Sequence, residues 1–103
     1  MILAVATYHE VVKAWYHGTT VKTSQLVVEM DTGDVFYLNN FNYDADCMAL
    51  QFIAFCGCRP SNSPDCLIGK QVPLTVTEDL EYMLPRALFK QGRARLENAS
   101  WFV

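Results

Sequence analysis

The side chains best suited to chemistry in this sequence of 103 residues are four cysteines and two histidines. Cys56 and Cys58 form a CGC pair, with Cys47 before it and Cys66 after it. Ordinary structural zinc sites use paired C-x-x-C knuckles, which this spacing lacks. We therefore expect free thiols in or near the core, with a zinc site or a disulfide as the less favoured readings. No metal and no cofactor is predicted.

Catalytic motifs are not recognisable in the sequence. His9 and His17 fall on the first expected strand, and neither stands beside a serine or cysteine in a nucleophile motif. The Ile-Gly-Lys step at residues 68–70 lacks the rest of a G-x-x-x-x-G-K-[ST] phosphate loop. Asp44 and Asp46 are explained by an expected helix start, where carboxylates suit the helix dipole. The sequence predicts a protein that is not an enzyme.

Charge is distributed unevenly along the chain. Residues 1–85 carry four basic and ten acidic side chains, whereas residues 86–103 carry four basic side chains and only Glu97, within a total net charge of −3. Such a basic segment on an acidic body can contact phosphate or an acidic protein surface. The alternative is a solvated helix or strand face.

Size and composition favour a single domain over residues 1–103. Apolar residues make up 51% of the chain, enough for a compact core. No stretch approaches eighteen uninterrupted apolar residues, and the first residues lack a leader pattern. We expect a soluble, cytoplasmic protein that does not enter a membrane.

Strand patterns dominate the first part of the chain. Residues 3–17 predict a long strand, bent near Thr7, and residues 25–30 and 35–38 predict two more. The Asp-Thr-Gly-Asp sequence at 31–34 predicts a tight hairpin that pairs Met30 with Val35 and directs Phe36 outward. On the first strand, the expected inner face holds Val12, Ala14 and Tyr16, and the outer face holds Val11, Lys13, Trp15 and His17. On the second, the inner face holds Leu26, Val28 and Met30, and the outer face holds Gln25, Val27 and Glu29.

The rest of the chain mixes helix and strand signals. Helical spacing predicts a helix that starts at Asn42 or Tyr43 and stops at Gly57. Residues 71–76 alternate as a strand, in which Pro73 requires a sheet edge or a bulge, after Gly69 releases the preceding loop. A short helical turn is expected over residues 77–85. The last strand is either residues 93–96 or residues 100–103, with breaks at Gly92 and Asn98.

This element order favours a mainly β fold with one helix. A five-stranded OB-like barrel has its helix between the third and fourth strands. The alternative is a small α+β sheet with one packed helix. In OB barrels, aromatic rings stack on nucleic-acid bases and cations hold the backbone. The residues expected to bind nucleic acid are Lys13, Trp15, Lys22, Phe36, Arg86, Lys90, Arg93 and Arg95.

Three runs carry a resemblance to a known family. They are YHEVVKAWYHGTTVKTSQLVVEM, NFNYDADCMALQFIAFCG and DCLIGKQVPLTV, within residues 8–76. Together they resemble phage-encoded OB-fold proteins of the single-stranded-DNA-binding type, with LIGK as the most motif-like part. The resemblance implies a role in replication or recombination through single-stranded DNA. This chain is shorter and lacks the long acidic tail of such proteins, which leaves partner recruitment in doubt.

A second hypothesis is an acidic inhibitor of a host protein, of the anti-CRISPR or anti-restriction kind. Carboxylates can imitate nucleic acid, and exposed aromatic side chains such as Trp15 and Trp101 can anchor a protein contact. The closing residues 98–103 fit either a last strand or a homodimer contact. The carboxylates that would act in mimicry include Asp31, Asp34, Asp44 and Asp46.

Overall fold

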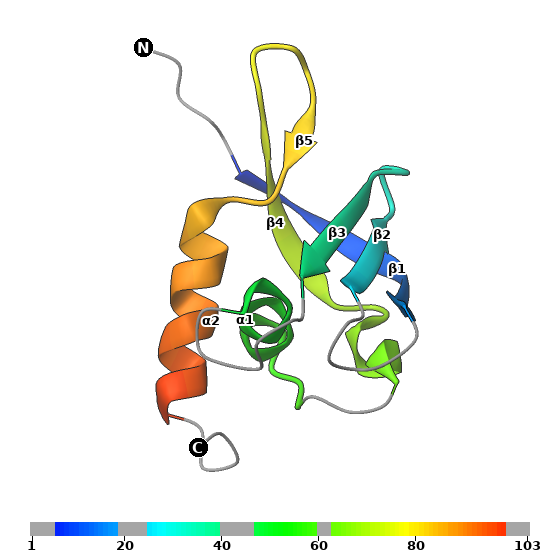
Figure 1. Cartoon of the computed structure of the whole chain (residues 1–103). Helices are drawn as coiled ribbons and strands as arrows, with labels where there is room; N and C mark the ends of the chain where they lie inside the picture. Colours follow the sequence, from blue (N-terminus) through cyan, green and yellow to red (C-terminus); the bar gives the residue numbers. More distant parts are fainter. Residues whose placement is uncertain (1–5, 19–24, 40–46, 60–62, 99–103) are drawn as a thin grey trace.

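A curled antiparallel sheet forms a half-barrel, with helices packed against it (Figure 1). The computed structural model describes residues 6–18, 25–39, 47–59 and 63–98, and within them the chain forms five strands, two α-helices and one 3₁₀ turn. In chain order these are β1 (Ala6–His17), β2 (Gln25–Met30), β3 (Val35–Asn39), α1 (Met48–Phe55), η1 (Pro64–Leu67), β4 (Gln71–Val76), β5 (Tyr82–Met83) and α2 (Arg86–Asn98). The sheet order is β3-β2-β1-β4-β5. The predicted mainly β architecture is confirmed, but it carries a second helix.

Strand β1 belongs to both halves of the sheet. Residues 6–10 pair with β4, and residues 11–17 pair with β2. At the change of partner Val12 is an extra residue in the ladder, a β-bulge that bends the strand. Val11 is bonded on the β4 side, where it donates to Lys70 and accepts from Gly69. The bend was expected near Thr7 and lies instead at Val12.

The bulge also corrects the predicted faces of β1. Val11 was expected outside but is fully buried, because the extra residue shifts the alternation by one position. After the bulge the faces follow the prediction: Ala14 is buried, whereas Lys13 and Trp15 are exposed. The bulge at Val12 therefore decides which residues of β1 face the core.

The β2–β3 hairpin has a three-residue turn. Met30 donates to the carbonyl of Asp34, Gly33 donates to the carbonyl of Met30, and Gly33 adopts φ +90°. We expected four turn residues, so the predicted register was wrong by one. Val28 pairs with Phe36, which places Phe36 on the core side.

Helix α1 is the central element of the core. Ala49, Phe52 and Ile53 are buried, as their helical spacing predicted. Gly57 follows with φ +76°, the left-handed conformation expected of a C-terminal stop. Cys47 was expected inside the helix but is its extended N-cap residue. The predicted starting residues, Asn42 or Tyr43, lie outside the described residues.

Helix α2 replaces the strand predicted at residues 93–96. Leu88 and Leu96 are buried against α1, about one helical turn before and after Gly92. A Cβ at Gly92 would overlap the backbone carbonyl of Gln51 in α1, so this glycine permits a close helix crossing. The sequence analysis took Gly92 for a break, although its role is in packing. The other strand candidate, residues 100–103, lies outside the described residues.

Strand β4 spans residues 71–76 as predicted, with Val72 and Leu74 buried. Pro73 pairs with Tyr8 of β1, while β5 reaches only Thr75 and Val76 on the other side. At residue 73 the strand therefore has one neighbouring strand, as a proline requires. Gly69 precedes the strand with φ +88°, the conformational release that was expected.

Residues 77–81 form a hairpin turn rather than the predicted helical turn. The Thr77 amide donates to the Glu81 carbonyl, and the Thr77 carbonyl accepts from the Leu80 amide. The Thr77 hydroxyl also accepts a hydrogen bond from the Glu81 amide. The chain then pairs β5 with the end of β4. Pro85, expected to terminate a helix, instead precedes α2, where its carbonyl accepts from the Leu88 amide.

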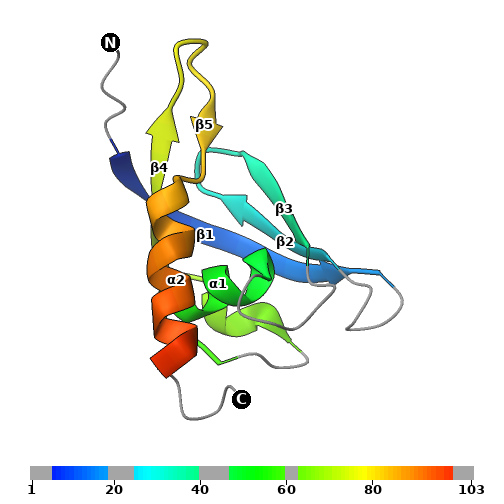
Figure 2. The same ribbon diagram turned by 60° about the vertical axis from the view of Figure 1, so that its left-hand side comes forward.

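Helix α1 lies beside α2 in both views, and in Figure 1 it stands between α2 and the strands β2 and β3 (Figure 1, Figure 2). The inner face of the sheet contributes Leu26, Val28 and Met30 to the same core as α1 and α2. None of the described helices is long and apolar enough to cross a membrane. Both described α-helices pack on one side of β1, β2 and β3, and neither lies against the opposite face.

Candidate functional site

The face of the sheet that points away from α1 carries two aromatic side chains in one cross-strand row. Trp15 of β1 pairs with Val27 of β2, which pairs with Tyr37 of β3. Paired residues point to the same face of a sheet, so all three face away from α1. We call Trp15, Val27 and Tyr37 the outer aromatic face. Trp15 is 38% exposed and Tyr37 is 62% exposed.

Val27 is the middle residue of this row. It was expected on the outer side and does point there, but it is fully buried. A valine between a tryptophan and a tyrosine on one face can lose its solvent contact to those larger neighbours. Because strands lie about 4.8 Å apart, the backbones that carry the two rings are roughly 10 Å apart. In this row the two rings are exposed, and the valine between them is not.

Charge on this face is balanced rather than positive. Lys13 lies two residues before Trp15 on the same side of β1 and is exposed. Its partner in the register is Glu29, which in turn pairs with Val35. His17, also exposed, ends the strand opposite Gln25. Lys13 is thus the lysine that the register places beside the aromatic rings, and a carboxylate stands opposite it.

Phe36 was predicted to join this face, and that prediction is wrong. The three-residue turn shifts the register, so Tyr37 occupies the outward position and Phe36 packs partly buried against the core. The sequence analysis missed Tyr37 as a site residue. Its signal was present, since Gly33 at the third turn position is typical of a three-residue hairpin loop with a bulge.

The basic residues of the carboxyl-terminal segment lie on a different surface. Arg86, Lys90 and Arg93 are exposed and spaced by four and three residues, which places them on one side of α2. We call these three residues the α2 basic stripe. Leu88, Gly92 and Leu96 are buried on the other side of the helix, against α1. The stripe therefore points away from the sheet, and Arg93 also pairs with Glu97 at 3.0 Å.

Arg95 has a structural environment that sets it apart from the stripe. Its guanidinium donates to the carbonyl oxygens of Ala54 and Phe55, at the end of α1. It also stands over the Phe55 ring, 5.2 Å from the centroid. A cation that satisfies the last carbonyls of a helix stabilises that end. Arg95 joins the two helices, and Lys22, the remaining predicted cation, lies outside the described residues.

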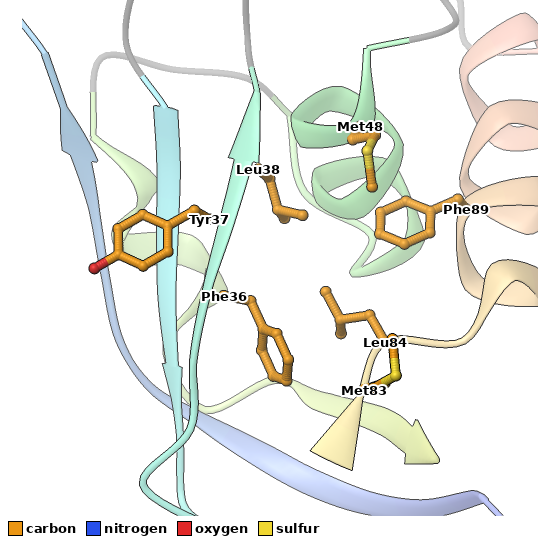
Figure 3. A pocket seen from close by; sticks show the side chains of 7 residues that line it. All are labelled: Phe36, Tyr37, Leu38, Met48, Met83, Leu84 and Phe89. Atoms are coloured by element: carbon orange, nitrogen blue, oxygen red, sulfur yellow. The ribbon is translucent and has the colours of Figure 1, made fainter. Parts of the chain in front are cut away.

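An apolar cavity of about 210 Å³ opens where β3 and β5 stand apart (Figure 3). Side chains from both edge strands and both helices point into it, whereas the Tyr37 ring points away, toward the outer aromatic face. The cavity and the outer aromatic face thus lie on opposite sides of β3. The lining residues are Phe36, Tyr37, Leu38, Met48, Met83, Leu84 and Phe89.

Neither a protein-family model, nor a curated protein, nor a solved structure matches this chain.

His9 and Asp31 make contacts that hold parts of the sheet together. His9 Nδ1 lies 3.1 Å from an oxygen of Asp31, and the Glu10 amide donates to the other oxygen at 3.0 Å. On its other side His9 Nε2 lies 2.7 Å from the Thr7 hydroxyl, and its ring meets Tyr82 edge to face. These contacts tie the β2–β3 turn to the centre of β1. His9 is a satisfied, half-buried residue.

The four cysteines are free thiols. Burial raises the pKa of Cys56 to about 12 and that of Cys58 to about 11, so both stay protonated near neutral pH. Among the described residues, no three histidine, cysteine, aspartate or glutamate side chains converge as a metal site would require. The site with the clearest binding chemistry is the outer aromatic face.

Proposed function

We propose that this protein binds single-stranded nucleic acid on the outer aromatic face. The observation that carries the proposal is the placement of the exposed Trp15 and Tyr37 on one side of three neighbouring strands, the side away from α1. Aromatic rings on a sheet are stacking platforms for unpaired bases, and each stacked base contributes about 1–3 kcal/mol. Lys13 supplies one cation beside them for a phosphate.

The topology supports an OB-like reading of the fold. The sheet order β3-β2-β1-β4-β5, with a bent β1 shared by both halves, suits a partly open five-stranded barrel, and α1 falls between β3 and β4 in the chain. In OB barrels the face of the second and third strands holds oligonucleotides. The alternative, an unrelated small α+β sheet, places the two rings on the same face.

The biological setting follows from the resemblance to phage single-stranded-DNA-binding proteins. A protein of that kind would act in replication or recombination of a phage or mobile element. This role depends on the binding proposed above and is the step to test after it.

The first test is fluorescence anisotropy of a labelled single-stranded DNA of mixed sequence, titrated with the protein at several salt concentrations. Trp15→Ala and Tyr37→Ala should each weaken binding about 5- to 150-fold, the range expected for one lost stacking contact. Tyr8→Ala is the matched control, because Tyr8 is 66% exposed but lies on the half of β1 that pairs with β4. It should leave affinity unchanged. Equal losses in all three variants, or no binding by the wild type, would overturn the proposal.

Salt dependence tests which cations take part. For single strands the logarithm of affinity falls with the logarithm of salt by about 0.7 per neutralised phosphate. Lys13 alone predicts a slope of about −1, whereas Lys13 together with the α2 basic stripe predicts about −3. The geometry favours the shallow slope, since the stripe faces away from the sheet.

The inhibitor hypothesis is the second candidate. Of its four named carboxylates, Asp31 is bonded to His9 and to the Glu10 amide, and Asp34 accepts from the Thr32 hydroxyl. Asp44 and Asp46 lie outside the described residues. Exposed rings can also anchor a protein surface. A wild type that ignores nucleic acid but retains a host protein through Trp15 would favour this candidate.

A further inference from the structure

The segment between α1 and β4 brings two cysteine thiols together. Cys58 follows the glycine that ends α1, and Cys66 lies in η1. The Cys58 thiol donates a hydrogen bond to the backbone carbonyl oxygen of Cys66 over 3.3 Å. This contact brings the two residues within the short range over which a disulfide can link them.

The two thiols differ in access to solvent. Cys66 is exposed, whereas Cys58 is 9% exposed. Burial, followed by the contact with Cys66, raises the pKa of Cys58 to about 11. A reagent in solution therefore meets Cys66 first, and Cys58 is placed to react with whatever forms on Cys66.

We propose that Cys58 and Cys66 form a reversible disulfide when the protein meets a low-molecular-weight disulfide. The Cys66 thiolate attacks one sulfur of the reagent, forms a mixed disulfide and releases one thiolate. Cys58 gives up its proton and attacks the Cys66 sulfur, forming the Cys58–Cys66 bond and releasing the second thiolate. The two cysteines are oxidised, the reagent is reduced to two thiols, and the cysteine protons balance the thiolates released.

The other cysteines are less suited to this exchange. Cys56 is separated from Cys58 by Gly57 alone, and such a short ring strains a disulfide. Cys47 is buried at the start of α1. The Cys58–Cys66 bond would instead close a ring around residues 59–65, which joins the end of α1 to the approach to β4.

The test exposes the folded full chain to oxidised glutathione, blocks remaining thiols with an alkylating reagent and maps the products by mass spectrometry. The wild type should lose two hydrogens in a Cys58–Cys66 cross-link, and added dithiol should reverse the change. Cys56→Ser is the matched control and should form the same cross-link. Cys58→Ser should instead keep glutathione on Cys66, because the second attack is removed.

The wild-type peptide map decides the matter even if a variant folds poorly. A glutathione adduct that persists on Cys66 while Cys58 is intact would overturn the proposal. A cross-link through Cys56 or Cys47, or full alkylation of Cys58 and Cys66 after oxidation, would overturn it as well. None of these outcomes bears on nucleic-acid binding, since neither cysteine belongs to the outer aromatic face.

Discussion

The outer aromatic face and the α2 basic stripe have complementary properties and lie on opposite sides of α1. The face offers two rings with one lysine beside them, and a glutamate opposes that lysine. The stripe offers three cations on a helix whose other side is buried. Stacking and charge are both useful to a protein that binds single strands. Here the fold separates them, so a strand held on the aromatic face gains little from the stripe.

The largest expected effect comes from the contact that holds the stripe in place. Gly92→Ala puts a Cβ onto the backbone carbonyl of Gln51, and the helices must move apart. We expect a loss of roughly 3 kcal/mol in the free energy of unfolding, measured by urea titration. Gln91→Ala, on an exposed neighbour, is the control and should change little. A Gly92→Ala protein as stable as the wild type would mean that α1 and α2 do not cross this closely.

Two adjacent residues of β3 should separate stability from binding. Phe36→Ala removes a partly buried ring from the core side and should cost about 2 kcal/mol in unfolding free energy, because its contacts are lost. Tyr37→Ala removes an exposed ring and should cost less than about 0.5 kcal/mol while it weakens nucleic-acid binding. Urea unfolding and anisotropy on the same two proteins measure both effects. If Phe36→Ala weakened binding and Tyr37→Ala lowered stability instead, Phe36 would be the outward residue, as the sequence first predicted.

Raised pH should destabilise the helix side of the molecule through Cys56. Burial raises the pKa of Cys56 from 9.0 to about 12, so the folded protein prefers the neutral thiol. The stabilisation is complete below pH 9 and is lost as pH rises through the interval up to about 12. The urea midpoint should therefore fall between neutral pH and about pH 10. In Cys56→Ser the urea midpoint should fall less over the same pH range. An equal fall in that variant would mean that other groups cause the loss of stability.

The smallest effect is expected from the stripe itself. Arg86→Gln and Lys90→Gln should each change the affinity for single-stranded DNA less than about twofold, because they face away from the rings. Lys13→Gln should have the larger effect of the three. Anisotropy at low salt is the sensitive condition. Tenfold losses at Arg86 or Lys90 would show that the bound strand continues from the sheet onto α2.

Local patterns predicted the elements whose signals are local. Strands β2 and β4 were placed correctly because alternation over six residues fixes both their type and their inner faces. Gly57 and Gly69 were read correctly because a positive φ has a strong residue preference. The outward placement of Lys13 and Trp15 followed from the same alternation.

The wrong predictions arose where one extra or missing residue shifts the alternation of inner and outer side chains. The bulge at Val12 and the three-residue turn before Asp34 each shift alternation by one position, which moved Val11 and Phe36 to the wrong face. Helix α2 was missed because Gly92 resembles a break until the neighbouring helix is known. That information is tertiary, and no local pattern contains it.

The division of β1 between two partners also has a consequence for the order of folding. Its second half pairs with β2, the next strand in the chain, whereas its first half pairs with β4, which lies beyond α1. Closing the shorter loop costs less chain entropy, and pairings of low contact order form faster. We expect pulsed hydrogen exchange during refolding to protect β2 and β3 amides before those of β4. The bulge at Val12 would then mark the boundary between an early meander and a late strand.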